Sequence, residues 1–332
     1  MIFEAVRRPI KTLLRAAIGL ALLTAVLWLA EPARVLQRLH GARWPWLAAG
    51  LLAAIASNLA SALRWRSLAA WLGAARVRVP DACRWYFQAI GLNALLPGAV
   101  LGGDVYRAVM LQRAAPDKQA SAAAAGWSVL LDRVSGVWML CVIGAFGAAA
   151  CAAPLAAAMH MNAALLAALA MLAAAVLLAA PWALPPLLRR VNTQGAAQGR
   201  FARLLVPLAQ AAQRPDFGQQ MRWQAFVSAA VQVLSAAALA CGALALGVQQ
   251  PLAVWAFAIA PIFLMAALPA SVGGWGTREA AAALALAPFG VATDAAVGAG
   301  MVYGLYALAQ GALGALAFGL PKAGKQENCQ GI

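Results

Sequence analysis

The chain has 332 residues, of which 64% are hydrophobic and only 11% are charged. Soluble domains carry charges on about 25% of their residues, so this composition excludes a soluble globular protein and predicts a polytopic membrane protein. The net charge of +15 would fit a nucleic-acid partner, but the arginines lie in short segments between apolar runs and form no single basic face. The excess of basic residues in cytoplasmic segments of membrane proteins explains them better.

Apolar runs predict about eight membrane-spanning segments, each near the roughly 20 residues that a crossing requires. In chain order they lie at about 13–30, 44–63, 134–153, 162–184, 223–247, 252–268, 278–289 and 295–320. The run 278–289 is too short to cross alone unless it continues from the segment before it. The expected fold is an all-α integral membrane protein, with a polytopic domain over 1–320 and a short polar cytoplasmic tail over 321–332.

Basic residues at the start of the chain, followed by an apolar run, are similar to a signal peptide, but the later spans favour an uncleaved first helix. With the N-terminus in the cytoplasm, every Lys and Arg except Arg34, Arg38 and Arg43 falls in a cytoplasmic segment. This asymmetry predicts that both termini are cytoplasmic, provided that residues 85–104 dip into the membrane and return. It also assigns Arg64 to a cytoplasmic segment.

Two basic connections are longer than simple loops. Residues 185–222 fit either an amphipathic stretch on anionic headgroups or an ordinary basic linker. Residues 64–84 have a similar composition, and Trp65 and Trp71 are expected at the depth of the membrane interface.

A motif occurs twice, as LPGAVLGGDVYR at 96–107 and LPASVGGWGTRE at 268–279. Proline removes a backbone donor and glycine loosens a helix, so such breaks inside a membrane need protein or water to satisfy the backbone. Paired broken segments indicate the substrate site of a membrane transport protein. The residues that form the breaks are Pro97, Gly102, Gly103, Pro269, Gly273, Gly274 and Gly276.

The repeated motif predicts two half-repeats, at about 10–135 and 220–320, each with one broken or re-entrant segment. The predicted spans lead into both motifs from the cytoplasmic side. Whether the repeat is inverted or parallel stays open at this point.

Ionisable residues inside a membrane indicate function, because a lone charge at the bilayer centre costs at least about 2.5–3.5 kcal/mol. Each acid among the candidates has a base beside or near it, so pairing can neutralise the set. The structural alternative is that Asp104 and Thr277 cap helices while Arg107 and Arg133 reach the headgroups. The candidate headgroup-binding residues are Asp104, Arg107, Asp132, Arg133, Arg278 and Glu279.

The chemistry of the repeat favours an anion. A helix that begins at a glycine-rich break directs backbone N–H groups at the gap, and an arginine within one turn adds donors that match phosphate oxygens. The nucleotide-binding pattern GxxxxGK[ST] is absent from the chain. We therefore expect an anionic lipid headgroup where the two motifs meet near the membrane midplane. Arg107 and Arg278 would bind the phosphate, while the three acids balance them or bind a cationic headgroup.

Neither a cofactor nor a metal site is expected. The five cysteines (Cys83, Cys141, Cys151, Cys241 and Cys329) form no CxxC pattern and are interpreted as packing residues. His40 and His160 are far apart in the sequence. Asp and Glu without His, Cys or a metal set also give acid–base catalysis little to work with, so an enzyme is the least favoured class.

Taken in order, the segments SALRWRSLAAWLG, LNALLPGAVLGGDVYRAVML, SVLLDRVSG and LPASVGGWGTREAA resemble the lysylphosphatidylglycerol synthase transmembrane-region family, from about residue 10 to residue 320. The resemblance implies a bacterial inner-membrane protein of the kind that forms the flippase portion of multiple peptide resistance factor. That module moves aminoacylated phosphatidylglycerol between leaflets. Relatives without the synthase domain occur beside polyprenol-linked glycan and hopanoid pathways. Only twelve residues follow Leu320, so synthase activity is not expected.

The leading hypothesis is a translocase for a phospholipid, or for a polyprenyl- or hopanoid-type lipid with a charged headgroup. One alternative is an ion-coupled transporter of a small anion, which requires an aqueous vestibule and transport that depends on Glu279. Another is a non-transporting partner that holds a lipid for a separately encoded membrane enzyme. The expected partner is thus membrane lipid, with or without such an enzyme, and not nucleic acid.

Overall fold

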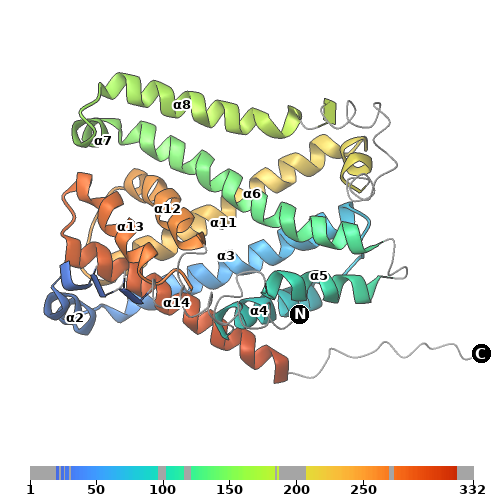
Figure 1. The fold of residues 1–332 in the computed structure, drawn as a ribbon, viewed down its shortest axis with the longest axis horizontal. Helices are drawn as coiled ribbons and strands as arrows, with labels where there is room; N and C mark the ends of the chain where they lie inside the picture. The colour runs from blue at the N-terminus through green and yellow to red at the C-terminus, as the bar shows by residue number, and fades with distance from the viewer. Residues whose placement is uncertain are drawn as a thin grey trace, which may run out of the picture.

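The computed structural model describes residues 20–21, 24–25, 27–29, 31–95, 102–115, 121–183, 185–186, 207–268 and 273–319. The elements assigned in this part of the chain are all helical (Figure 1). They are α2 (Pro32–His40), α3 (Trp44–Trp71), α4 (Val79–Leu95), α5 (Gly102–Ala114), α6 (Ser121–Ala150), α7 (Ala152–Ala158), α8 (Ala163–Ala179), α11 (Phe217–Ala245), α12 (Leu252–Ala267), α13 (Thr277–Leu286) and α14 (Thr293–Gly319), with two short 3-10 helices, η1 (Ala180–Ala183) and η3 (Ala287–Phe289).

Five helices in the described residues are long and apolar enough to cross a membrane, which confirms the predicted all-α membrane fold. They are α3, α6, α8 with η1, α11 and α14. The predicted first span, 13–30, lies mostly outside the described residues.

Two of the predicted crossings, 252–268 and 278–289, are the arms of a hairpin. Helix α12 has 16 residues and α13 has 10, about 24 and 15 Å at roughly 1.5 Å per residue. Neither spans a hydrocarbon core of about 30 Å. The two helices pack against each other, and α13 is too short to cross alone, as the sequence indicates for 278–289.

Helices α3 and α11 form the central pair and run antiparallel (Figure 1). At one end, the Arg43 backbone N–H donates to the Ala245 carbonyl over 3.0 Å. At the centre, the Ser57 hydroxyl lies 2.9 Å from the Ser235 hydroxyl. At the other end, the Trp71 indole donates to Asp216 over 3.3 Å. The two helices therefore contact each other along their whole length in opposite directions.

The chain forms two hairpins that start from opposite ends of this central pair. The first hairpin, α4 and α5, follows the end of α3, and the second hairpin, α12 and α13, follows the end of α11. Helix α4 packs on α14, which follows the second hairpin, and α12 packs on α6, which follows the first. Since α3 and α11 are antiparallel, the prediction that both motifs are entered from the same side is wrong.

Glycines allow α4 to pack closely on α14, and α12 to pack closely on α6. A Cβ added at Gly314 of α14 would lie 2.0 Å from the Phe87 carbonyl oxygen of α4. A Cβ at Gly147 of α6 would lie 2.3 Å from the Phe257 backbone nitrogen of α12. Side chains at these positions would force the helix backbones apart.

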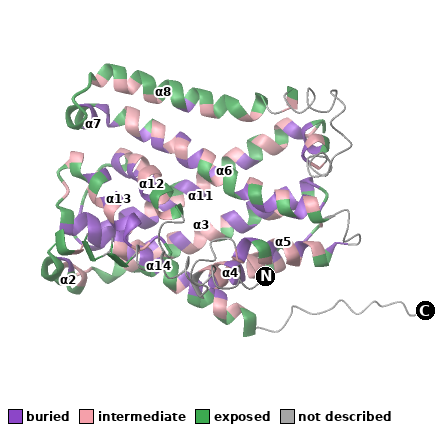
Figure 2. Ribbon diagram, in the orientation of Figure 1, coloured by how far each residue is buried: buried purple, intermediate pink, exposed green. Residues whose placement is uncertain are grey.

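Burial follows this architecture. The buried residues concentrate where α11, α12, α13 and α14 meet, while α8 is largely exposed along its length (Figure 2). Trp65 and Trp71 are only 1% and 7% exposed, and their depth at the membrane interface stays a prediction. Helix α3 continues past residue 63, so these tryptophans pack inside the bundle and not at its surface. In the basic connection, 187–206 lies outside the described residues, and Leu208 and Ala212 are buried in the same cluster.

Gln224 of α11 is a buried amide whose two polar atoms have no hydrogen-bond partner within the described structure. It lines an apolar cavity of about 260 Å³ between α3, α6, η1 and α11. A buried unsatisfied polar group costs about 1–3 kcal/mol, whereas an apolar side chain of the same shape carries no such penalty. We therefore expect Gln224→Met to raise the free energy of unfolding, measured by denaturant titration in neutral detergent micelles.

Gln232, about two turns further along α11, is the matched control. Its amide donates to the Gly136 carbonyl over 2.8 Å. Gln232→Met should therefore destabilise the protein. If Gln224→Met lowers stability as much as Gln232→Met does, the amide of Gln224 is satisfied in solution.

Candidate functional site

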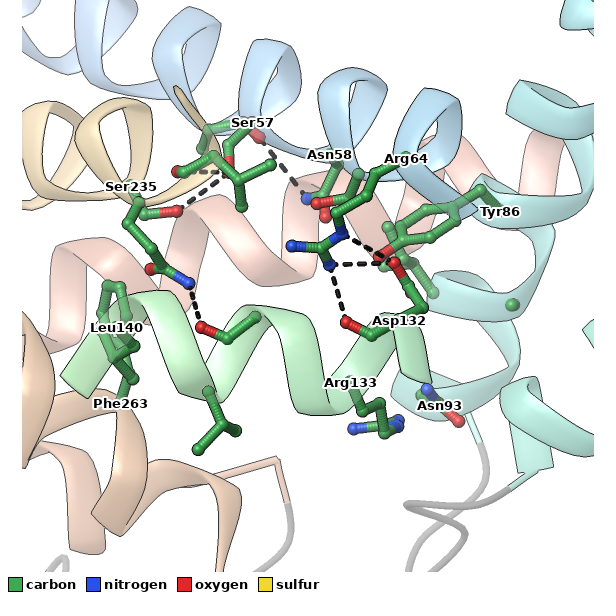
Figure 3. A pocket seen from close by; sticks show the side chains of 18 of the residues that line it. Ser57, Asn58, Arg64, Tyr86, Asn93, Asp132, Arg133, Leu140, Ser235 and Phe263 are labelled. Atoms are coloured by element: carbon green, nitrogen blue, oxygen red, sulfur yellow. Dashed lines mark hydrogen bonds and ion pairs between the residues drawn. The ribbon is translucent and has the colours of Figure 1, made fainter. Parts of the chain in front are cut away.

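A cavity of about 410 Å³ lies at the centre of the bundle, between the first hairpin, α3, α6 and α11 (Figure 3). One side of it is charged, the opposite side carries uncharged polar side chains, and the rest of the lining is apolar. The lining residues are Ala54, Ser57, Asn58, Ser61, Arg64, Tyr86, Ala89, Ile90, Asn93, Asp104, Arg107, Asp132, Arg133, Gly136, Val137, Leu140, Val231, Gln232, Ser235, Phe263 and Tyr303.

Asp132 of α6 is the centre of the charged network and is 2% exposed. Its carboxylate accepts from Arg64 Nε over 3.0 Å and from Arg64 Nη2 over 2.8 Å. The same Nη2 also donates to the Asp132 carbonyl, and Arg64 Nη1 donates to the Ser228 hydroxyl over 3.1 Å. The donors of Arg64 are thus used within the protein, and its position is fixed by α6 and α11 together.

Arg107 of α5 joins the two acids. It donates to Asp132 over 2.9 Å and to Asp104, one turn earlier on α5, also over 2.9 Å. Its guanidinium lies 4.6 Å from the centre of the Tyr86 ring and 5.2 Å from that of Trp65. Cation–π contacts of this kind hold a desolvated guanidinium with its planar face covered. The edge of the group therefore remains the part that faces the acids.

Arg133, next to Asp132 on α6, completes the network through an ion pair with Asp104. The cavity lining thus contains three guanidinium groups and two carboxylates, a net charge of one positive unit. Because charge interactions are strong in a low dielectric, this excess favours an anion in the cavity.

The cavity opens along one face of α6. The Arg133 side chain is 43% exposed, although it pairs with a buried acid. Val137, one turn further along the same helix, is 45% exposed. Both line the cavity, so its mouth lies on the side of a membrane-spanning helix, within the length of the span.

The wall opposite the arginines is polar but uncharged. The Ser57 hydroxyl donates to the Val231 carbonyl over 3.1 Å, and the Gln232 amide donates to Gly136. Asn58 donates to both Ala54 of its own helix and Gln310 of α14, so the interhelical and intrahelical alternatives for this residue both occur. These bonds fix the side chains that line this part of the cavity.

Arg278 and Glu279 of the second motif form a separate buried pair. Arg278 Nη2 donates to Glu279 over 2.7 Å, and Arg278 Nε donates to the Gly300 carbonyl over 2.9 Å. The Glu279 carboxylate also accepts from the Gly276 backbone N–H over 2.6 Å at the start of α13. With Trp275 at 4.9 Å from the Arg278 guanidinium, the pair is enclosed and electrically balanced.

The structure therefore brings together four of the six predicted site residues. Asp104, Arg107, Asp132 and Arg133 line the cavity, whereas Arg278 and Glu279 do not. Both motif arginines are buried and neither points to bulk solvent, but the expected shared cradle with two arginines on one phosphate does not occur. Arg278 instead donates its hydrogen bonds to Glu279 and to a backbone carbonyl.

The glycines of the motifs have distinct structural roles. Gly273, Gly274 and Gly276 have φ angles of 62°, 76° and 84°, which L-residues rarely adopt. Gly102 and Gly103 open α5, and a Cβ at Gly103 would lie 2.3 Å from the Ala89 carbonyl oxygen. Pro97 and Pro269 lie outside the described residues.

The predicted capping roles are different in the structure. The carboxylate of Asp104 pairs with Arg107 and Arg133, and Thr277 donates its hydroxyl to the Gly274 carbonyl over 3.1 Å. The start of α5 is instead capped by Asn93 of α4, whose Oδ1 accepts from the Gly103 backbone N–H over 2.8 Å. This bond connects the two arms of the first hairpin.

Arg64 is the main charged residue of the cavity that the sequence prediction missed. It is 3% exposed, although it was assigned to a cytoplasmic segment. A signal for it exists, because Ser57, Ser61 and Arg64 are spaced by one helical turn each within an apolar run. A polar stripe of this kind predicts a helix that continues beyond residue 63 with one face toward a polar cavity.

Replacement of Asn93 tests how the hairpin is held. Asn93→Ala removes the acceptor of the Gly103 N–H, and loss of such a cap costs about 0.5–2 kcal/mol. We expect this decrease in the free energy of unfolding in micelles, and Asn93→Asp, which keeps an acceptor near a helix N-terminus, should retain most of the stability. Equal losses for both variants would show that the cap contributes nothing.

Other candidates from the sequence play no part in this site. Cys83, Cys141, Cys151 and Cys241 are free thiols, and Cys329 lies outside the described residues. Within the residues that the structure describes, no group of three or more His, Cys, Asp or Glu side chains is placed to hold a metal ion.

The fold and the cavity define a multi-pass helical membrane protein with a charged, laterally open cavity between its spans. The chain belongs to the family described as the lysylphosphatidylglycerol synthase TM region, whose family model matches residues 16–314. This confirms the family resemblance found in the sequence, and it places the protein among membrane proteins associated with lipids. A comparison with curated proteins found no match.

Proposed function

We propose that the protein is a lipid translocase of the bacterial inner membrane that binds the phosphate-bearing headgroup of a membrane lipid in the central cavity. The observation that carries this proposal is the cavity itself, which has an excess guanidinium group and lies within the spans. A lipid of this class is already present in the bilayer, so a side opening is sufficient for access. The family to which the chain belongs supports the same class of ligand.

The position of each arginine suggests its role. Arg64 holds Asp132, and Arg107 links Asp132 to Asp104, so both complete the buried framework. Arg133 is the half-exposed arginine at the mouth. A phosphate that enters along α6 meets Arg133 first and then the edge of Arg107, while its acyl chains lie against Val137 and the lipid-facing surface.

The arrangement of the hairpins supports transport across the membrane. The two hairpins start from opposite ends of the antiparallel pair α3 and α11, and each packs on the long helix that follows the other. We propose that the two sequence repeats correspond to α3–α6 and α11–α14 as an inverted pair. Inverted repeats let one site communicate alternately with the two sides of a membrane.

Charge at the two ends supports an orientation. Arg76, Arg78 and Arg113 lie at the end where α3 and α5 end, whereas Arg34, Arg38 and Arg43 lie at the end where α3 begins. Among the described residues, Arg66, Arg84, Arg214 and Arg222 also lie near the first end. By the positive-inside rule we propose that this basic end faces the cytoplasm.

Transport by Arg133→Gln tests the proposal. We expect the wild-type protein in liposomes to expose a fluorescent phosphatidylglycerol of the inner leaflet to an external quencher. The variant should slow this exposure about tenfold or more, because a hydrogen bond to a charged group contributes about 1.5–3 kcal/mol. The measurement is the rate of fluorescence loss in vesicles of equal protein content.

Arg214→Gln is the matched control for this experiment. Arg214 is 47% exposed and pairs with Asp216 over 3.1 Å, much as Arg133 pairs with Asp104, but it does not line the cavity. The Arg214→Gln variant should transport the fluorescent lipid at the wild-type rate. A wild-type rate no faster than that of empty liposomes, or uptake of inorganic phosphate in place of lipid, contradicts the proposal.

A further inference from the structure

A second cavity, of about 620 Å³, lies on the outer side of the first hairpin at the basic end of the bundle. It is formed by the segment before α4, by α4 and α5, and by the last turns of α14. It shares no lining residue with the central cavity. The lining residues are Arg76, Val77, Arg78, Asp81, Arg84, Trp85, Gln88, Tyr106, Met110, Arg113, Ala114 and Phe318.

Positive charge is concentrated around this cavity. Four arginines and a single acid, Asp81, line it, which leaves three positive charges in excess. Arg76, Arg78 and Arg113 make no salt bridge with any other residue that the structure describes. Like charges in one pocket repel each other, and an anion bound among them removes that repulsion. The phosphodiester of a membrane lipid carries its charge on two non-ester oxygens, which suit guanidinium donors that come from several directions.

The other walls of the cavity are those of a lipid site. Trp85, Met110 and Phe318 provide apolar surface, and the Tyr106 ring packs edge-on against Phe318 at 5.7 Å between centres. The Tyr106 hydroxyl donates to Gln88 over 2.6 Å, and the Gln88 amide donates to the Ala317 carbonyl over 3.0 Å. This chain of bonds fixes the boundary between the charged and apolar walls.

The depth of the cavity in the membrane agrees with this chemistry. Phe318 is the penultimate residue of the membrane-spanning helix α14, and Trp85 and Tyr106 beside it are the two residue types that concentrate at the level of the lipid headgroups. Basic pockets between spans at this depth bind the headgroups of anionic lipids. The arginines and the aromatic side chains therefore meet where a lipid phosphate and its glycerol backbone lie.

We propose that this second cavity, which we call the basic pocket, binds the phosphate of an anionic membrane lipid as a resident ligand, separate from the lipid in the central cavity. Arg76 and Arg78 approach the phosphate from the segment before α4, and Arg113 approaches it from the end of α5. The proposal does not depend on transport by the central cavity.

Binding in the basic pocket has a structural consequence. The bound headgroup would connect the beginning of α4 with the end of α5, which are the two open ends of the first hairpin, and would connect both with α14. A ligand that binds only the folded state stabilises it in proportion to the logarithm of its concentration. An anionic lipid should therefore stabilise the whole protein through the hairpin that carries Asp104 and Arg107.

The test uses the purified, delipidated full-length chain in a neutral detergent. Dioleoyl phosphatidylglycerol is titrated against it, and bound lipid is counted by native mass spectrometry while the melting temperature is followed. The variant Arg76→Gln/Arg113→Gln is compared with the matched control Arg34→Gln/Arg43→Gln, which removes two exposed arginines at the other end. We expect the lipid to raise the melting temperature of the wild type and the control. In the basic-pocket variant the apparent affinity should fall at least about tenfold, since two charge-assisted contacts are lost.

Two further comparisons distinguish a lipid phosphate from free inorganic phosphate, and binding in the basic pocket from binding in the central cavity. Dioleoyl phosphatidylcholine should bind more weakly than phosphatidylglycerol, and inorganic phosphate at the same concentration should not stabilise the protein. Arg133→Gln weakens lipid binding in the central cavity only, so this variant should still retain one bound lipid and the part of the stabilisation that the basic pocket supplies. Equal lipid binding by the basic-pocket variant and its control overturns the proposal, and stabilisation by inorganic phosphate alone overturns the assignment to lipid.

Discussion

Replacement of Asp132 by asparagine should cost about 3–5 kcal/mol of the free energy of unfolding, the effect of removing one partner from a buried ion pair. Asp132 neutralises both Arg64 and Arg107, which are 3% and 4% exposed. Without the charge of Asp132, the buried guanidinium groups of Arg64 and Arg107 remain. Asp104 is then the single carboxylate of the cavity lining, and it must balance these two groups and Arg133 as well. The measurement is denaturant-induced unfolding in neutral detergent micelles, followed by tryptophan fluorescence.

Glu31→Gln is the control for this prediction. Glu31 pairs with Arg34 over 2.8 Å, but the two side chains are 60% and 65% exposed. Exposed pairs contribute only about 0.2–1 kcal/mol. If Asp132→Asn loses no more stability than Glu31→Gln, the network does not hold the cavity together and its description here is wrong.

Replacement of Gly314 by alanine should separate the first hairpin from α14. The new Cβ would lie 2.0 Å from the Phe87 carbonyl oxygen and 2.8 Å from the Gly91 backbone nitrogen, and backbone atoms cannot move aside as flexible side chains do. Overpacking of this kind costs about 1–3 kcal/mol, occasionally more. The expected result is a lower melting temperature together with a lower rate of lipid transport, because α4 carries Tyr86 and Asn93 to the cavity.

Gly126→Ala, in α6, gives the comparison. A Cβ at Gly126 meets nothing within 4 Å. In an exposed helix, alanine is about 1 kcal/mol more favourable than glycine, so this variant should be as stable as the wild type or slightly more stable. A Gly314→Ala protein with the stability of Gly126→Ala would contradict the close packing of α4 on α14.

The sequence predicted the fold class because composition alone forces it. A chain with so few charges must place its apolar runs in a membrane, and a membrane permits few architectures besides helices. The boundaries of the runs were less accurate wherever a buried charge interrupts a span. Arg64 ended the predicted second span at residue 63, yet α3 continues to Trp71, because Asp132 and Ser228 on neighbouring helices satisfy the guanidinium.

The sequence located the charges of the cavity but not the different pairing in the second motif. Asp104 and Arg107 were singled out as charges in the first broken segment, and Asp132 and Arg133 as charges at the start of a predicted span. The cavity brings the four together. The second motif has almost the same sequence, but Glu279 directly follows Arg278, so that pair closes on itself at the start of α13. Residue spacing within one motif did not reveal this difference, since it depends on the Gly300 carbonyl, which α14 supplies.

The selectivity of transport between two labelled lipids tests the central claim most directly. Fluorescent phosphatidylglycerol and fluorescent glucosylceramide, which carries no phosphate, are compared in the same proteoliposomes. The positively charged cavity predicts rapid movement of the phosphate-bearing lipid and slow movement of the neutral one, with the difference reduced by Arg133→Gln. Equal rates for both lipids, unchanged in the variant, would mean that the cavity does not recognise a phosphate.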